Sequence, residues 1–357
     1  VLLVEAGPAD HHPLIHVPAG FLRLIDHPRL SWRDRGQADA TLHGRTIAYP
    51  QGRMLGGTGS LNGLLYVRTS PVEHAAWEAA GCTGWSHAAA LAAYRRIEGD
   101  AGDAEPGLPL HETHNGAERE GAAAFQQVRA GRFRRGPAQS YLRRARPRAN
   151  LQVLTGSLAR AVLFDGRRAV GVELRSAGRR SRVAARHEVI VACGAIRSPQ
   201  LLQVSGVGPG ALLQSLGVPV RADRPQVGEN LRDHYAVRLT HRVHGVRTLN
   251  ERTRGGALWA ELWRYAWRGD GLLTLGASTC PAFARSRDGL AGPDLQLSFA
   301  PGSFVPGTYA LEPQPGMTLS VYHSFPESRG TVRARSADAG EAPEIRPGYL
   351  QTPADRA

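Results

Sequence analysis

A glycine-rich stretch, RMLGGTGSLNGLLYVR, has the residue types of an anion-binding loop. It covers residues 53–68 and combines its glycines with Thr58, Ser60 and Asn62 before it continues into apolar residues. Glycine lets backbone N–H groups approach a ligand without a Cβ in the way, and a helix that opens after such a loop presents free N–H groups at its positive end. The stretch is therefore typical of a phosphate or pyrophosphate site, with an ordinary glycine-rich turn as the alternative.

A second candidate is the acidic residue that closes an apolar run at the start of the chain. Residues 1–4 are apolar, Glu5 follows them, and Gly7 and Pro8 break the run. This pattern predicts a buried parallel strand. In a dinucleotide-binding βαβ unit, an acidic residue at the end of the second strand binds the ribose hydroxyls. The alternative is a strand that happens to end in glutamate.

Hydrophobic patterns predict the elements that would position these residues. Residues 72–98 and 138–145 read as helices, and residues 151–174 as strands with a hairpin turn at Asp165-Gly166. Residues 187–195 predict another buried strand, and a helix then starts near Ser198-Pro199. Residues 257–268 place Trp259, Trp263 and Trp267 on one helical face. Such a face predicts core or a cleft wall in preference to a membrane anchor.

Composition limits the function classes. The formal charge is +13, which suggests nucleic acid as a partner. However, the chain contains no lysine, so its 44 basic residues are all arginine and also fit a GC-rich genome. RNA-binding aromatic signatures and zinc-finger spacing are missing, which argues against nucleic acid. The three cysteines are widely spaced, which favours a reducing, cytoplasmic location. Association with a membrane surface is left as an alternative. No apolar run is long enough to predict a membrane span.

Several runs, in their order along the chain, resemble the glucose–methanol–choline (GMC) oxidoreductase family of FAD-dependent alcohol oxidases and dehydrogenases. They are LLVEAGP, PQGRMLGGTGSLNGLLYVR, GWSH, YRRIE, GAIRSPQLLQVSGVGP, VGENLRDH, PESRGTVRARS and PEIRPGYLQTPAD. The second and fifth runs correspond to the two family signatures. The resemblance spans nearly the whole chain, and it implies that the glycine loop lies along FAD.

The resemblance also implies roles for individual residues. Glu5 would bind the adenosine ribose, Ala159 would lie at the adenine, and Trp32 would approach the cofactor region. The glycine loop would contact FAD through Met54, Gly56, Gly57, Thr58, Ser60, Asn62, Gly63, Leu64 and Leu65. Some relatives attach FAD covalently through a histidine just before the asparagine. That position is Leu61 here, so the resemblance implies noncovalent FAD.

The implied architecture is α/β. A Rossmann-like FAD-binding module would occupy residues 1–235, and residues 236–357 would hold part of an α+β substrate domain with an antiparallel sheet, together with the start of the C-terminal module. The implied reaction is oxidation of a primary alcohol, choline-like or another small alcohol, with hydride passing to flavin N5. The partners would be that alcohol and an electron acceptor, oxygen or a quinone. No metal is implied, because His111, Glu112 and His114 lack the spacing of a zinc site.

The sequence also departs from the family pattern. The glycine fingerprint expected before Glu5 is missing, and a stretch of substrate-domain sequence is missing between residues 100 and 111. The catalytic histidine and its His or Asn partner would lie beyond Ala357, so no residue here takes those roles. We therefore expect the 357 residues alone to bind FAD poorly and to oxidise no alcohol. An inactive remnant of such an enzyme is the alternative, and a basic nucleic-acid-binding protein a remote one.

Overall fold

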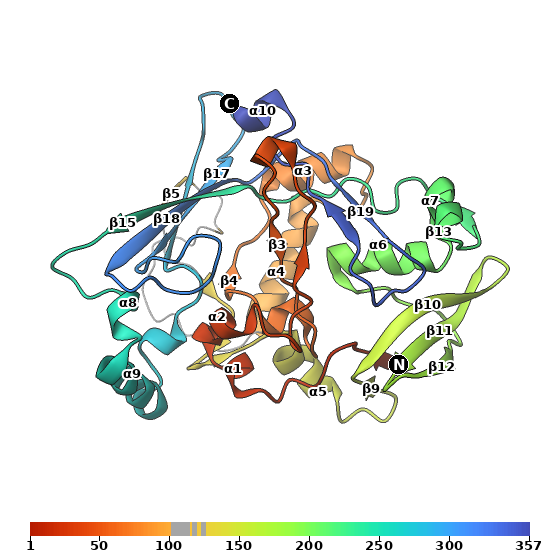
Figure 1. Cartoon of the computed structure of the whole chain (residues 1–357), viewed down its shortest axis with the longest axis horizontal. Helices are drawn as coiled ribbons and strands as arrows, with labels where there is room; N and C mark the ends of the chain where they lie inside the picture. The colour runs from red at the N-terminus through yellow and green to blue at the C-terminus, as the bar shows by residue number, and fades with distance from the viewer. Residues whose placement is uncertain (101–114, 116–119, 123–125) are drawn as a thin grey trace.

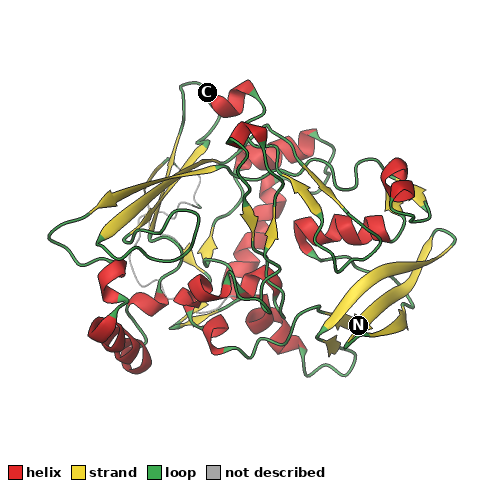
Figure 2. Ribbon diagram, in the orientation of Figure 1, coloured by secondary structure: helices red, strands yellow, loops and turns green. Residues whose placement is uncertain are grey.

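A computed structural model describes residues 1–100, 115, 120–122 and 126–357. Two groups of elements lie on either side of a central stack of short strands, loops and helices (Figure 1). One group is built on a large antiparallel sheet, and the other contains the N-terminal strand, a three-stranded sheet and two helices. Figure 2 shows how much of the chain between them is loop.

The N-terminal strand pairs as the sequence predicts. Strand β1 (Leu2–Val4) runs parallel to β9 (Gln152–Leu154), with Leu3 opposite Val153. Strand β10 (Ser157–Asp165) then forms the predicted hairpin with β11 (Arg168–Ser176), and β12 (Arg179–Ala184) completes an antiparallel sheet. The turn contains Gly166 at φ +53°, a left-handed conformation that favours glycine. The predicted hairpin is therefore confirmed.

The strand predicted over residues 187–195 is wrong. Between β12 and the next helix the chain is not paired in any ladder of the described residues. Val189 and Val191 pack against a core cluster, whereas Ile190 is 76% exposed. The alternation typical of a strand is present, but a strand also needs a hydrogen-bonding neighbour. The following helix, α6 (Gly194–Val204), begins one turn earlier than predicted, so Pro199 lies inside it.

The large sheet is antiparallel throughout, in the order β15-β18-β17-β16-β5. Its strands are β15 (Ala236–Arg242), β18 (Gly316–His323), β17 (Leu295–Ala300), β16 (Cys280–Ala284) and β5 (Gly121–Ala122). Strand β15 begins directly after residue 235, whereas β5 comes from before it. The division into modules at that residue therefore stays a proposal.

The helical pattern of residues 72–98 corresponds to α3 (Pro71–Ala79) and α4 (His87–Asp100). The helix predicted over residues 138–145 is a π-helix, Ala138–Leu142, that continues into α5 (Arg143–Ala145). Helix α9 (Gly255–Arg268) carries the three tryptophans on one face. Their exposed fractions are 74% for Trp259, 68% for Trp263 and 77% for Trp267. The prediction that this face belongs to the core is therefore wrong, and the alternative, a cleft wall, stays a prediction. The four-residue spacing of the tryptophans predicts that they share one face of the helix. It does not predict which face of the helix packs against the rest of the protein.

The remaining elements are short. They are α1 (Pro13–His16), α2 (Phe21–Leu24), β2 (Asp34–Arg35), β3 (Ala48–Tyr49), β4 (Leu65–Tyr66), β6 (Gln126–Gln127), β7 (Arg129–Ala130), β8 (Phe133–Arg134), β13 (Val207–Gly208), α7 (Gly210–Ser215), β14 (Ala222–Asp223), α8 (Leu249–Arg252), β19 (Thr331–Arg333), β20 (Glu344–Arg346) and α10 (Pro353–Arg356), with 3₁₀ turns at Pro18–Gly20, Ala40–Leu42, Gly57–Ser60 and Leu272–Thr274. In the described ranges, no helix has the length and apolar character needed to cross a bilayer.

Two core clusters hold the regions that contain the predicted cofactor residues. One consists of Ile15, Leu24, Leu30, Met54 and Leu61, and it fixes the glycine loop against α1 and α2. The other consists of Val162, Leu201, Val204, Ala334 and Ala339, and it packs β10 against α6. Cys82, Cys193 and Cys280 are all free thiols.

Candidate cofactor site

The glycine loop has a backbone that only glycine tolerates at several positions. Gly56 and Gly57 have φ of +92° and +54°, and residues Gly57–Ser60 form a 3₁₀ turn. A Cβ on Gly59 would lie 2.3 Å from Pro137 Cδ, and one on Gly63 would lie 2.4 Å from Ala277 Cβ. The chain packs tightly behind this loop, so a larger residue at either position would force the loop away from its neighbours.

The loop has a buried side and an exposed side. Met54, Ser60, Leu61 and Leu64 are buried, and the Ser60 hydroxyl donates a hydrogen bond of 2.9 Å to Leu55 O. On the other side, Thr58 and Asn62 are exposed, and an added Cβ on Gly57 would meet nothing within 4 Å. A ligand would therefore meet Gly57, Thr58 and Asn62 directly. Any contact from Met54, Ser60 or Leu64 would have to come through the backbone.

Glu5 lies beside this loop at the end of β1. Its Oε1 accepts a hydrogen bond of 2.7 Å from Gly7 N–H, and its backbone carbonyl accepts one of 2.9 Å from Ser157 N–H at the start of β10. A Cβ on Gly7 would lie 1.9 Å from Arg53 O, so this glycine is what lets the two segments meet. Ala159 lies two residues further along β10 and packs partly against Val162 and its neighbours.

Partial burial raises the pKa of Glu5 above its usual value. The Gly7 N–H group and the positive charge of Arg53 counteract part of this effect. Burial therefore disfavours the ionised form of Glu5 in the folded protein. A ligand that donates a hydrogen bond to this carboxylate would stabilise the ionised form. A ribose hydroxyl is such a donor.

Arg53 is a candidate that the sequence analysis missed. Its Nε is buried and has no hydrogen-bond partner among the described residues, and its guanidinium lies 4.7 Å from the centre of the Trp32 ring. It is close enough to Glu5 to affect the pKa of that carboxyl group. A cation with an unused donor directly before a glycine loop suits a diphosphate. The sequence feature that could have identified Arg53 is its position directly before the glycine loop.

Trp32 lies close to two arginines. The guanidinium of Arg197, a residue of α6, lies 4.1 Å from the centre of the Trp32 ring. The guanidinium of Arg53 lies close to the same ring. Arg197 Nη2 also donates to both carboxylate oxygens of buried Asp34, at 2.6 and 2.8 Å. The structure thus brings Trp32, Arg53 and Glu5 into one region and fixes it to α6.

Arg134 supports the loop from behind, which sequence reasoning also missed. Its side chain is 1% exposed, and it donates to Asn62 Oδ1 at 2.7 Å and to Asn62 O at 2.8 Å. Longer bonds reach Gly59 O and Pro18 O at 3.3 and 3.4 Å. Burial lowers the pKa of Arg134 to about 10. The only signal in the sequence was the local arginine cluster GRFRRG.

Among the residues that the structure describes, we assign a catalytic role to no histidine. His323 lines a cavity of about 390 Å³ at the end of β18. Its ring nitrogens lie 3.6 Å from Asp294 and 3.7 Å from Asp355. His111, Glu112 and His114 lie outside the described residues. Within those residues, no group of three metal-binding side chains comes together.

A family model for GMC oxidoreductases matches residues 33–106 and 101–236. The two segments meet where the sequence analysis places a missing stretch of substrate-domain sequence. The chain belongs to the GMC oxidoreductase family. Its fold is the family's FAD-binding part combined with a substrate part, FAD is its cofactor, and its class is oxidoreductase.

Relatives and solved structures agree with this family. The chain is 32% identical to the oxygen-dependent choline dehydrogenase of Photobacterium profundum, over 100% of its own length and 68% of the relative's. It is 33% identical to that of Rhizobium johnstonii, over 98% of the chain and 69% of the relative. The crystal structure of pyridoxine 4-oxidase from Mesorbium loti is 26% identical, with a TM-score of 0.83 over 100% of this chain and 72% of that one. Formate oxidase, 21% identical, shares the fold with a TM-score of 0.83 over 99% of this chain and 74% of that one.

Proposed function

We propose that the protein oxidises a primary alcohol, choline-like or another small alcohol, with noncovalently bound FAD as its cofactor. The observation that carries this proposal is the convergence of Glu5, Arg53 and the exposed side of the glycine loop. Together they offer a carboxylate, an unused guanidinium donor and an open backbone. These groups match a ribose, a diphosphate and a flat ring system.

Each of these residues has a proposed binding role. Glu5 accepts hydrogen bonds from the ribose, Arg53 offsets the diphosphate charge, and Ala159 lies toward the adenine. Gly57, Thr58 and Asn62 lie against the flavin, with Arg134 fixing the Asn62 carbonyl and amide. When bound, FAD supplies the acceptor for the hydride that leaves the alcohol carbon. We assign the base to none of the described residues.

The substrate class rests on the relatives. Those more than 25% identical to this chain are called choline dehydrogenase and pyridoxine 4-oxidase, which differ in substrate, whereas formate oxidase, at 21%, shares the fold alone. We therefore propose a small primary alcohol, and oxygen or a quinone as the electron acceptor. Assay of the full-length gene product that contains these residues, with a panel of alcohols and an artificial acceptor, tests this. Bound flavin without turnover on any of them would instead support an inactive remnant.

Noncovalent attachment leads to a prediction. Leu61 stands at the position of covalent attachment, is 2% exposed and packs in the cluster with Met54. An aliphatic side chain that points into the core forms no bond with a flavin. We expect acid precipitation of the purified protein to leave the flavin in the supernatant. Flavin fluorescence on the denatured polypeptide in a gel would contradict this.

A second prediction concerns Glu5. Replacing Glu5 by glutamine should weaken FAD binding by about 10- to 100-fold, because a charge-assisted hydrogen bond contributes about 1.5–3 kcal/mol. Since the pKa of Glu5 is raised, FAD affinity of the wild type should fall as pH decreases through that pKa. A neutral carboxyl group accepts the ribose hydrogen bond less well. Titration of apoprotein with FAD at several pH values measures both effects.

The control for this experiment is Glu188→Gln. Glu188 is exposed and lies outside the loop region, so its substitution removes the same charge without touching the proposed ribose contact. Its FAD affinity and pH dependence should match the wild type. If Glu5→Gln binds FAD as the wild type does, with the same pH dependence, Glu5 does not contact the ribose.

A further inference from the structure

Arg134 is a buried cation without a counter-charge. Its side chain is 1% exposed, and its four hydrogen bonds all go to neutral oxygen atoms of Asn62, Gly59 and Pro18. Its Nε has no hydrogen-bond partner among the residues that the structure describes. Buried charges are normally paired, because an unpaired charge is costly to take out of water. An anion close to this side chain would therefore be favoured.

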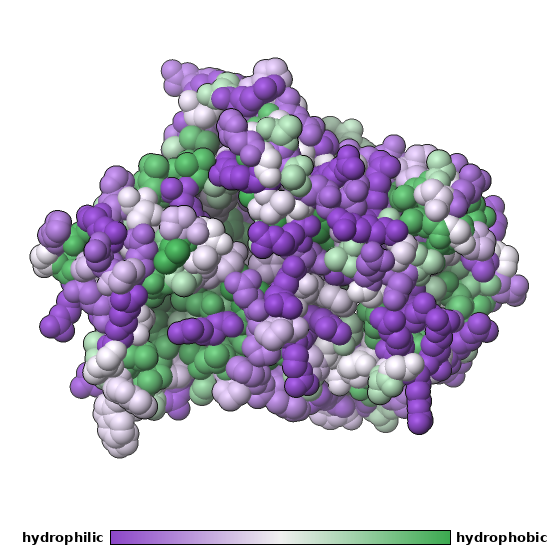
Figure 3. Space-filling model, viewed as in Figure 1, coloured by the Kyte–Doolittle hydropathy of each residue, from purple (hydrophilic) through white to green (hydrophobic). Residues whose placement is uncertain are grey.

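A pocket of about 510 Å³ lies beside Arg134. It reaches helix α9 through Tyr265, which the helical spacing places opposite the three exposed tryptophans. The tryptophans protrude at the lower left in Figure 3, where the surface is near-white. The pocket therefore lies on the inward side of α9 and is not part of the tryptophan surface.

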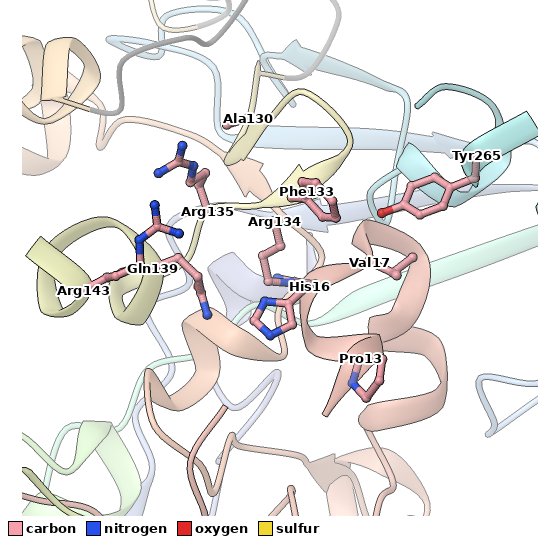
Figure 4. A pocket seen from close by; sticks show the side chains of 10 residues that line it. All are labelled: Pro13, His16, Val17, Ala130, Phe133, Arg134, Arg135, Gln139, Arg143 and Tyr265. Atoms are coloured by element: carbon pink, nitrogen blue, oxygen red, sulfur yellow. The ribbon is translucent and has the colours of Figure 1, made fainter. Parts of the chain in front are cut away.

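One side of the pocket carries positive charge. Arg135 and Arg143 lie on this side (Figure 4), and neither forms an ion pair or a side-chain hydrogen bond with another described residue. No carboxylate lines the pocket in the described ranges. The Asp10 carboxylate accepts a hydrogen bond of 2.7 Å from Gln139 Nε2, but it does not contribute to the pKa of Arg134, which burial lowers. Guanidinium groups that share a pocket repel one another, and a bound anion would remove this repulsion.

The other side of the pocket is aromatic and apolar. Phe133 and Tyr265 lie there, with Val17 close to Tyr265 (Figure 4). The Tyr265 hydroxyl donates a hydrogen bond of 2.9 Å to Arg132 O, which fixes the position of the ring. Phe133 is 48% exposed, so a ligand can reach its ring. The pocket thus offers cations on one side and an apolar surface on the other.

We propose that this pocket binds a small organic carboxylate, with its charge on Arg135 and Arg143 and its apolar body against Phe133 and Tyr265. Guanidinium groups bind carboxylates through charge-assisted hydrogen bonds, and the volume suits a small molecule. The carboxylate would also offset the charge of Arg134 without touching its buried Nε. An inorganic anion fits less well, because it would leave the apolar side of the pocket to water. No residue of the glycine loop lines this pocket, so the carboxylate should bind alongside FAD and not in its place.

Isothermal titration calorimetry of the full-length gene product, with its cofactor bound, tests this proposal. The probe is phenylacetate, compared with phenylacetamide, which lacks the charge, and with acetate, which lacks the ring. We expect phenylacetate to bind at least about tenfold more tightly than either of them. The double variant Arg135→Met, Arg143→Met should bind phenylacetate at least about tenfold more weakly than the wild type, because it removes both carboxylate donors.

The matched control is Arg148→Met. Arg148 is exposed and close to Arg143 in the sequence, but it does not line the pocket, so this variant should bind phenylacetate as the wild type does. Urea unfolding of the double variant should match the wild type, because neither arginine that it replaces has a partner to lose. The proposal is overturned by equal binding of phenylacetate and phenylacetamide, by equal binding of acetate, or by no saturable binding of phenylacetate. Undiminished binding to the double variant, or release of FAD by phenylacetate, would also overturn it.

Discussion

Replacing Arg134 by methionine should lower the free energy of unfolding by about 3 kcal/mol and weaken FAD binding. The Arg134 guanidinium is the donor for both oxygens of Asn62 and for Gly59 O. Without it, Asn62 O and Gly59 O lose this part-buried donor, and Asn62 Oδ1 keeps only the Leu64 N–H at 3.2 Å. Because Gly59 and Asn62 bracket the exposed side of the loop, the loss should also loosen the proposed cofactor contacts. Urea unfolding and FAD titration of the same preparations measure the two effects.

Arg135→Met is the matched control for this prediction. It removes the same charge one residue further along the chain, where the side chain lines the pocket in Figure 4 and not the back of the loop. Its unfolding free energy should stay within about 0.5–1 kcal/mol of the wild type. If the two variants are equally stable, the hydrogen bonds of Arg134 do not support the loop.

Local patterns predicted those elements whose partners lie close in the sequence. The hairpin of β10 and β11 depends on Asp165-Gly166 and on the alternation on either side of it, and both are visible in the sequence. The strand predicted over residues 187–195 shows the limit of this reasoning. Its alternation is real, since Val189 and Val191 face the core and Ile190 does not. A ladder, however, requires a second segment, which alternation cannot supply.

The candidate site divides in the same way. The glycine loop and Glu5 could be predicted, because glycine at close approach and an acid after a strand are local signals. The supporting arginines could not be predicted individually. Arg134 reaches the loop across 72 positions of sequence, and Arg197 reaches Asp34 across 163. In a chain with 44 arginines, residue type alone does not show which of them are buried.

The largest loss of stability should follow substitution of Asp34. Asp34 is 3% exposed and Arg197 is 8% exposed, so both charges of the pair are buried. Asp34→Asn would leave the Arg197 guanidinium without its counter-charge. Removing one partner of such a pair costs about 3–5 kcal/mol. We expect this loss in urea unfolding, and Asp26→Asn, which changes an exposed carboxylate, should leave the stability within about 0.5 kcal/mol of the wild type.

A double-mutant cycle separates the ion pair from the other contacts of Arg197. This side chain also donates to Gln200 Oε1 at 2.9 Å and to Glu341 O at 3.1 Å, and it lies against Trp32. We expect Asp34→Leu with Arg197→Met to cost at least about 2 kcal/mol less than the sum of the single variants, because the double variant leaves no unpaired charge. It should still be less stable than the wild type, since the contacts to Gln200, Glu341 and Trp32 are lost. Additive single effects would show that Asp34 and Arg197 stabilise the fold independently, and that the pair does not hold Trp32 beside the cofactor loop.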